Sequence, residues 1–247
     1  MYEYFIGTLF FGIFWAFLFA FRRDLRWPMI WTAAAYILFS GILVSVWHIA
    51  RQFVYLREPI VPSYWYPPTF FDLSRFTGFG GIEDLLWLFF IAGISTAIYE
   101  FLYRGTIIHK RGHRFFVLAL IFSFASFFIF EYFFAVNLVY SICVAHLVGA
   151  LVLWIQRRDL IKHSLFGASA FLIVYFFAFL LVLVVYPSFI SDFYNLNTTS
   201  SILFLGIPLE EFLYAFSFGL FWGPLYEYVH GEVSRLKGSR TIRGRRR

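Results

Sequence analysis

Residues 165–186 read LFGASAFLIVYFFAFLLVLVVY, a run without a single charged side chain. About 20 apolar residues are enough for an α-helix to cross the hydrocarbon core of a bilayer. The whole chain has the same character, since 61% of its 247 residues are hydrophobic, 25% are aromatic and only 14% are charged. A soluble domain of this size cannot bury so much apolar surface. The composition therefore predicts an integral membrane protein.

The spacing of the apolar runs predicts an all-α polytopic protein with seven transmembrane helices. Between the fourth and fifth runs there is room only for a tight turn, which we expect at Asn137. Residues 165–186 form one predicted span, and the other six are residues 4–21, 28–49, 82–103, 115–134, 138–156 and 203–229.

The distribution of basic residues predicts the orientation of these spans. Of the 20 Lys and Arg residues, 17 follow the first span, the third span, the fifth span or the last span. The opposite side keeps Arg51, Arg57 and Arg75. Because basic loops stay inside, the amino terminus is expected outside and the carboxyl terminus inside. The basic tail is expected to meet anionic lipid, and no nucleic-acid partner is predicted.

Two charged motifs recur along the chain and indicate an internal repeat. The sequence Arg-Arg-Asp-Leu occupies residues 22–25 and again residues 157–160, 135 positions later. The sequence GIEDLL at residues 81–86 corresponds to PLEEFL at residues 208–213, at a shift of 127. A Tyr-Glu pair, ending in Glu100 or Glu227, follows each acidic segment at the same distance. Such recurrence in register predicts two equivalent units.

Each predicted unit contains three spans, so one extra crossing is needed for both copies to enter from the same side. The repeat is therefore expected to be parallel, related by an axis along the membrane normal. The predicted parts are a first three-helix unit at 1–105, a connector helix at 106–136, a second three-helix unit at 137–231 and a basic cytoplasmic tail at 232–247.

Acidic residues at the start of the third and seventh spans are the candidate catalytic groups. Charged groups near hydrocarbon are costly and usually functional. Two adjacent carboxyl groups in apolar surroundings can hold a proton and deliver it to a substrate. The alternative reading is simple capping of the helix N-termini. The candidates are Glu83, Asp84, Glu210 and Glu211.

The acids at the opposite ends of these spans are expected to be structural. Glu100 and Glu227 lie at the same level as the repeated Arg-Arg-Asp-Leu motifs, and an arginine can satisfy a carboxylate there. The predicted ion-pair partners are Arg22 and Arg23 in the first unit and Arg157 and Arg158 in the second.

No metal and no cofactor are predicted from the histidines and cysteine. His48 and His146 have no second His or Cys at ligand spacing, and Cys143 is the single cysteine. A histidine in such a position is more often a packed core residue than a ligand.

The repeated acidic openings, the Tyr-Glu closes and the Arg-Arg-Asp-Leu motifs resemble the integral-membrane lycopene cyclase domain family. Residues 207–212, IPLEEF, are the most specific part of this resemblance. Trp65, before Pro67 and Pro68, resembles a Trp-containing stretch that precedes the third span in that family. One departure is Gly81, where the family usually has proline. The candidate substrate-binding residues are the aromatic side chains Trp65, Trp87, Phe212 and Tyr214.

The resemblance implies a redox-neutral cyclisation. An acid protonates the terminal double bond of an acyclic polyene end, the neighbouring alkene attacks the cation, and loss of a proton leaves a six-membered ring. The implied partners are a lipid-soluble polyene such as lycopene and membrane lipid, and a homo-oligomer is possible. A non-catalytic isoprenoid-binding protein and a proton-coupled transporter stay open as alternatives.

Overall fold

The computed structural model describes residues 3–54, 56, 64–70, 80–103, 106–109, 116–134 and 136–235. Within these residues, six helices are long and apolar enough to cross a membrane. The long helices are α1 (Glu3–Phe21), α2 (Arg26–Arg51), α5 (Ile82–Tyr103), α6 (Phe116–Phe134), α7 (Leu138–Gln156) and α8 (Ile161–Val185). The chain is thus a helical membrane protein, as its composition predicts.

The last apolar run, predicted as one span over 203–229, is shorter and broken. It begins as a hairpin of β2 (Leu203–Phe204) and β3 (Ile207–Pro208), followed by α10 (Leu209–Trp222) and α11 (Leu225–His230). Gly206 has a φ of +82° in the hairpin turn, a conformation that glycine adopts without strain. Between the two helices, Pro224 lacks an amide hydrogen and ends α10.

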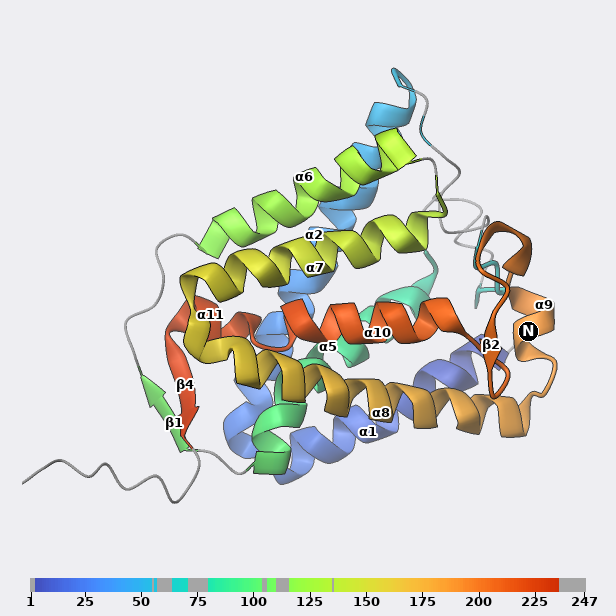
Figure 1. The fold of residues 1–247 in the computed structure, drawn as a ribbon. Coiled ribbons are helices and arrows are strands. Elements are labelled where there is room, and N and C mark those ends of the chain that lie inside the picture. The colour runs from blue at the N-terminus through green and yellow to red at the C-terminus, as the bar shows by residue number, and fades with distance from the viewer. Residues whose placement is uncertain are drawn as a thin grey trace, which may run out of the picture.

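Helix α10 lies at the centre of the bundle and is packed against α7 and α8 (Figure 1). Helix α5 packs against α1, α2 and α8, while α6 packs on α7 at the edge of the molecule. The turn predicted at Asn137 caps α7, since the Asn137 side chain accepts a hydrogen bond from the Val139 amide at 3.0 Å.

The loops gather at the two ends of the bundle (Figure 1). At one end lie the chain start, the β2–β3 hairpin and α9 (Phe189–Phe193), and Trp65 pairs with Tyr194 there. At the other end, β1 (Thr106–His109) pairs antiparallel with β4 (Glu232–Arg235). These strands lie in the segments that precede the fourth predicted span and follow the last one. The rest of the tail, 236–247, lies outside the described residues.

The two Arg-Arg-Asp-Leu motifs fold in the same way. Residues Arg23–Leu25 form the 3₁₀-helix η1 and residues Arg158–Leu160 form η3. The preceding arginines share an unusual backbone conformation, with φ and ψ of −118° and 81° at Arg22 and −135° and 74° at Arg157. In both places the turn leads from one long helix directly into the next.

Gly219 allows α10 to approach α8 closely. A Cβ atom at this position would lie 2.7 Å from the Cα atom of Ala168, which is backbone and cannot move aside. We expect Gly219→Ala to lower the free energy of unfolding by about 1–3 kcal/mol, the usual cost of overpacking. Thermal unfolding in detergent measures this effect.

Gly41 on α2 is the matched control, since nothing lies within 4 Å of a Cβ atom there. Gly41→Ala should leave stability unchanged or raise it, because alanine favours a helix more than glycine does. Equal effects of the two substitutions would contradict the close approach of α10 and α8.

Candidate functional site

A cavity of about 280 Å³ opens among the helix ends that carry the acidic motifs. Its walls come from α1, α2, α5, α7, α8 and α10, so both predicted three-helix units contribute to it. The lining is almost entirely aromatic and aliphatic. Asp84 and Glu211 are the two carboxyl groups in it. Each is therefore placed where it can meet an apolar ligand.

Glu211 lies in the first turn of α10, with its carboxylate held by tyrosine hydroxyls. The Tyr64 hydroxyl donates to Oε1 at 3.0 Å, and the Tyr175 hydroxyl donates to Oε2 at 2.6 Å. Both tyrosines also line the cavity, as does Tyr194 beside the same carboxylate. Glu211 is only 7% exposed, and it lines the cavity together with these tyrosines.

The tyrosines outside the helices keep their protons. Burial raises the pKa of Tyr64 and of Tyr194, and the neighbouring Glu211 carboxylate raises the pKa of both phenols further. A phenol in these surroundings stays neutral and acts as a hydrogen-bond donor. The donors fix the direction in which the Glu211 carboxyl group faces.

Asp84 occupies the position that corresponds to Glu211 in the repeated acidic motif, and it also lines the cavity. The Tyr4 hydroxyl donates to Asp84 Oδ1 at 2.6 Å, and the Gly81 amide donates to Oδ2 at 2.6 Å. The side chain is half-buried, unlike that of Glu211. Asp84 is therefore the less enclosed of the two carboxyl groups in the lining.

The first acid of each pair lies outside the cavity lining. Glu83 accepts a hydrogen bond from the Phe70 amide at 2.6 Å, and Glu210 accepts one from the Ser200 amide at 2.8 Å. The Tyr140 hydroxyl also donates to Glu210. These two acids tie loops to the starts of α5 and α10. The structure thus separates four candidates that look equivalent in the sequence.

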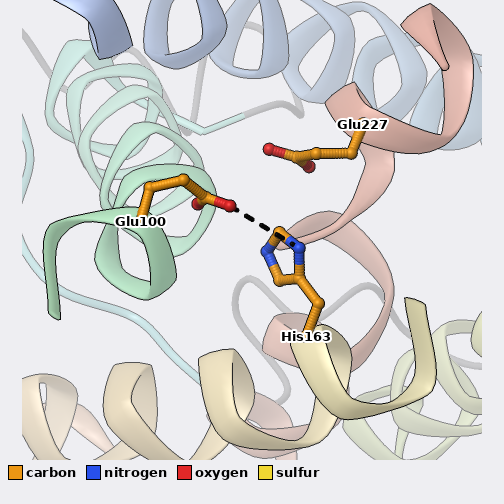
Figure 2. A group of neighbouring side chains, drawn as sticks. All are labelled: Glu100, His163 and Glu227. Atoms are coloured by element: carbon orange, nitrogen blue, oxygen red, sulfur yellow. Dashed lines mark ion pairs between the residues drawn. The ribbon is translucent and has the colours of Figure 1, made fainter. Parts of the chain in front are cut away.

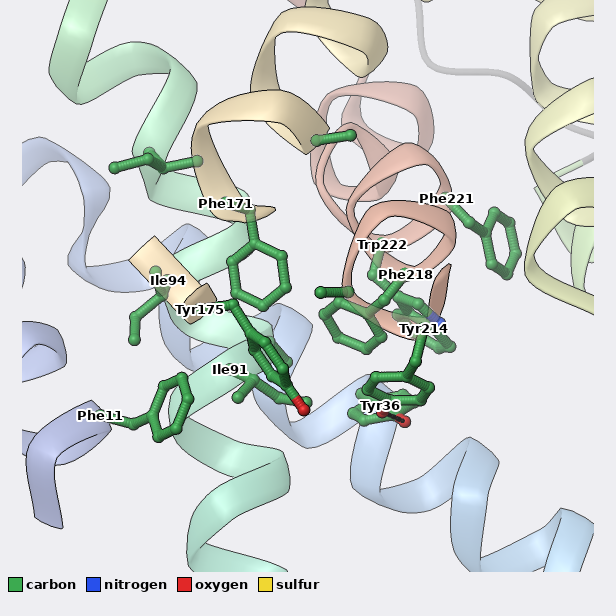
Figure 3. Packing of buried hydrophobic residues seen from close by; sticks show 14 of the residues in the cluster. Phe11, Tyr36, Ile91, Ile94, Phe171, Tyr175, Tyr214, Phe218, Phe221 and Trp222 are labelled. Carbon is green, nitrogen blue, oxygen red and sulfur yellow. Dashed lines mark hydrogen bonds between the residues drawn. The ribbon is translucent and has the colours of Figure 1, made fainter. Parts of the chain in front are cut away.

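Aromatic rings enclose the space beside Asp84 and Glu211. Trp87 stacks on Tyr214 with ring centroids 5.7 Å apart, and the hydroxyls of Tyr214 and Tyr36 are 2.8 Å apart. Figure 3 shows Tyr36, Tyr175 and Tyr214 pointing into the same region. Trp65 also lines the cavity, with its ring centroid 5.0 Å from that of Tyr4. Ring faces of this kind stabilise a cation.

Phe212, which was expected to bind substrate, lies away from the aromatic rings that line the cavity. Its ring packs against Phe176 and Phe204, with centroids 5.6 and 5.7 Å away, and it is not among the residues that line the cavity. One position on a helix turns the side chain by about 100°, so Glu211 and Phe212 cannot face the same way.

Among the lining residues that the sequence did not single out are four tyrosines beside the two carboxyl groups, namely Tyr4, Tyr64, Tyr175 and Tyr194. Tyrosines are frequent in this chain, and nothing in their spacing marks these four. His146, interpreted as a packed core residue, also lines the cavity, with its ring 5.8 Å from that of Tyr214. A polar residue in the middle of an apolar span was the available signal for it.

At the opposite ends of the helices, the first arginine of each Arg-Arg-Asp-Leu motif is less exposed than the second. Arg22 forms an ion pair with Asp24 at 2.7 Å and donates to the main-chain carbonyl of Glu100, also at 2.7 Å. The two carboxylate oxygens of Glu100 accept no hydrogen bond among the described residues. Arg22, which was predicted to pair with the Glu100 carboxylate, contacts the backbone of Glu100 in the structure.

The second Arg-Arg-Asp-Leu motif shows a similar arrangement. Arg157 forms an ion pair with Asp159 at 2.9 Å, and its Nη1 atom lies 3.5 Å from the main-chain carbonyl of Glu227. Arg23 and Arg158, also predicted to form buried ion pairs, are exposed. The short 3₁₀ turn explains this difference, since consecutive side chains in it point in different directions.

We expect Arg157→Gln to destabilise the protein by about 1–3 kcal/mol, because it removes a buried charged donor from its acceptors. Arg158→Gln is the matched control and should change the free energy of unfolding by less than about 0.5 kcal/mol, as surface substitutions do. Denaturation followed in detergent tests both. Equal losses for the two variants would contradict the placement of Arg157 at the helix ends.

A family model described as lycopene cyclase matches residues 137–229. This segment covers α7, α8, α10 and α11, and therefore includes both Glu210 and Glu211. No curated protein and no solved structure matches the chain. The match supports the resemblance to the lycopene cyclase family over residues 137–229 of this helical membrane protein.

Proposed function

We propose that the protein is a carotenoid cyclase, which converts an acyclic polyene end into a six-membered ring without oxidation or reduction. The family match over residues 137–229 supports a cyclase. The observation that carries the proposal is the cavity, which combines an apolar aromatic lining with two carboxyl groups, Asp84 and Glu211. Acid catalysis of a hydrocarbon requires a proton donor, a proton acceptor and stabilisation of the cation between them.

Glu211 is proposed as the acid. It transfers its proton to the terminal double bond, and a carbon–hydrogen bond forms while a tertiary cation develops. A general acid for an alkene must be enclosed with it, because water would otherwise accept the proton or trap the cation. Glu211 is the more enclosed of the two carboxyl groups, and its tyrosine partners fix its direction.

Asp84 is proposed as the base. After the neighbouring alkene has attacked the cation, a proton must leave the new ring, and its electron pair forms the ring double bond. Asp84 is half-buried at the outer rim, so it can pass the proton onward. The substrate gains one proton and loses one proton, so the product has the same composition as the substrate. Trp87 and Tyr214 are proposed to stabilise the ring cation between these steps, with Trp65 at the outer end of the site.

The dimensions of the cavity suit one end of a long polyene. Pockets that hold whole drug-sized molecules have volumes of roughly 300–1,000 Å³, and this cavity has about 280 Å³. Only the reacting end group is then enclosed, and the rest of the substrate stays in lipid. Lycopene is the proposed substrate, and an enzyme of the isomerase or lyase class is the proposed type.

The full architecture is part of the proposal. Helices α10 and α11 together are proposed to form a seventh span, which gives two parallel three-helix units joined by α6. The matching turns after α1 and α7, and the equivalent positions of Asp84 and Glu211, support this arrangement. The amino terminus is proposed to face outside.

Expression in a lycopene-accumulating bacterium tests the function. Chromatography of the extracted pigments should show monocyclic or bicyclic carotenoids that an empty vector does not produce. If membrane-inserted protein is present and lycopene alone is recovered, carotenoid cyclisation is the wrong function.

Reporter fusions test the orientation. Fusions after Gly105 and at the carboxyl terminus should both report the cytoplasm, while a fusion at Tyr66 should report the outside, because basic loops stay inside. The β1–β4 pairing requires the first two sites to lie on one side. An external signal at the carboxyl terminus would overturn both the orientation and the parallel repeat.

A further inference from the structure

A second group of buried ionisable side chains lies at the far end of the helices from the cavity. Glu100 on α5, His163 on α8 and Glu227 on α11 each offer one ligand atom, and these three atoms lie within 4.8 Å of one another. Figure 2 shows the three side chains converging from three helices. Glu100 is 16 residues beyond Asp84 on the same helix, which is about 24 Å. This cluster is therefore separate from the proposed cyclase site.

The cluster is enclosed. The exposed fractions are 1% for Glu100, 4% for His163 and 5% for Glu227. The His163 ring is held in place by stacking on Tyr99, with ring centroids 4.1 Å apart. A ring that is fixed in this way presents its nitrogen atoms in constant directions.

The Glu100 carboxylate lacks the partners that a buried charge needs. Neither of its oxygens accepts a hydrogen bond among the described residues, although Oε1 lies 3.6 Å from His163 Nδ1. Arg22 pairs with Asp24 and donates its hydrogen bond to the main chain of Glu100, not to the carboxylate. A buried carboxylate is stable only when it is paired with a charge, hydrogen-bonded or bound to a metal.

The chemistry of the three side chains fits a transition metal. Two carboxylate oxygens and one imidazole nitrogen are typical ligands of Zn²⁺ and similar divalent ions, whereas Mg²⁺ and Ca²⁺ prefer oxygen alone. Zn²⁺ binds such ligands at about 2.0–2.2 Å, so three ligand atoms on one ion lie roughly 3.3–3.8 Å apart. His163 Nδ1 and Glu100 Oε1, at 3.6 Å, already have this spacing. The three ligand atoms lie within 4.8 Å of one another, so an approach of about 1 Å by the side chains would bring all of them to binding distance.

We propose that Glu100, His163 and Glu227 bind one divalent transition-metal ion, which joins α5, α8 and α11 at the inner end of the bundle. The ion has a structural role, because it connects the two predicted units away from the cavity. His163 has no equivalent histidine after the first Arg-Arg-Asp-Leu motif, where Pro28 occupies the corresponding position. The proposal does not depend on the cyclase function.

Metal binding by the full-length protein in detergent tests this site. After treatment with a chelator, the protein is titrated with Zn²⁺, and with Co²⁺ for its visible absorption. We expect one ion per chain and a higher unfolding temperature with Zn²⁺. His163→Gln removes a direct ligand. It should weaken Zn²⁺ binding by more than the roughly 10–100-fold that loss of a supporting partner costs.

His48→Gln is the matched control, since this histidine lies at the opposite end of the bundle on α2 and should leave binding unchanged. Glu100→Gln gives a second test if His163→Gln does not fold. Failure of the wild-type protein to bind either ion at micromolar concentrations would overturn the proposal, and would favour a proton shared between the carboxyl groups. Zn²⁺ binding by His163→Gln and Glu100→Gln that is as strong as binding by the wild-type protein would overturn it as well.

Discussion

Glu211→Gln should abolish cyclisation while leaving the protein folded and inserted in the membrane. Glutamine keeps the shape of glutamate. Its carbonyl oxygen can accept a hydrogen bond from one of Tyr64 and Tyr175, and its amide NH₂ can donate to the hydroxyl oxygen of the other. It cannot deliver a proton to an alkene. The expected loss of rate is about 10²–10⁴-fold, the usual contribution of one general acid. Pigment analysis against equal amounts of membrane protein measures it.

Glu210→Gln is the control for this experiment, because the neighbouring acid lies outside the cavity and accepts hydrogen bonds from Tyr140 and the Ser200 amide. This variant should lose less than about tenfold in rate and should instead lower thermal stability, since it weakens a buried hydrogen-bonded contact. If Glu210→Gln is inactive and Glu211→Gln is active, the assignment of the two acids is reversed.

Asp84→Asn should produce a loss of about 10²-fold, at the lower end of the range for a general base, because water at the outer rim can accept the proton in its place. The position of the base decides which proton the ring cation loses. We therefore expect the variant also to change the ratio of ring isomers, measured by chromatography.

Glu83→Gln is the matched control, since Glu83 accepts its hydrogen bond from the Phe70 amide away from the cavity. It should keep the wild-type isomer ratio. An Asp84→Asn variant with full activity and an unchanged isomer ratio would show that Asp84 is not the base.

The helices could be predicted from the sequence because each is an apolar run with clear ends. The bounds expected for the third and fifth spans, 82–103 and 138–156, are those of α5 and α7. The prediction of the last span was less accurate, because an apolar composition does not distinguish a β-hairpin or a helix interrupted by proline from a continuous helix. Leu203 and Pro224 are both compatible with an apolar run.

The candidate site could be predicted only in outline. The acidic motifs were visible, but which acid of each pair meets the cavity depends on the rotation of α5 and α10 about their axes. That rotation is fixed by packing, for example by the contact between Gly219 and Ala168. The tyrosines around Glu211 come from separate segments at positions 64, 175 and 194. His163 was missed because its partners Glu100 and Glu227 are distant in the sequence.

The origin of the new hydrogen atom tests the central claim most directly. Wild-type protein in detergent is given lycopene in ordinary water and in deuterated water, and the products are examined by mass spectrometry. Because Glu211 exchanges its proton with solvent, we expect a ring product with the mass of lycopene in ordinary water and one deuterium for each ring in deuterated water, with no product from Glu211→Gln. A ring product without deuterium, or one that differs in mass from lycopene in ordinary water, would contradict acid-catalysed cyclisation.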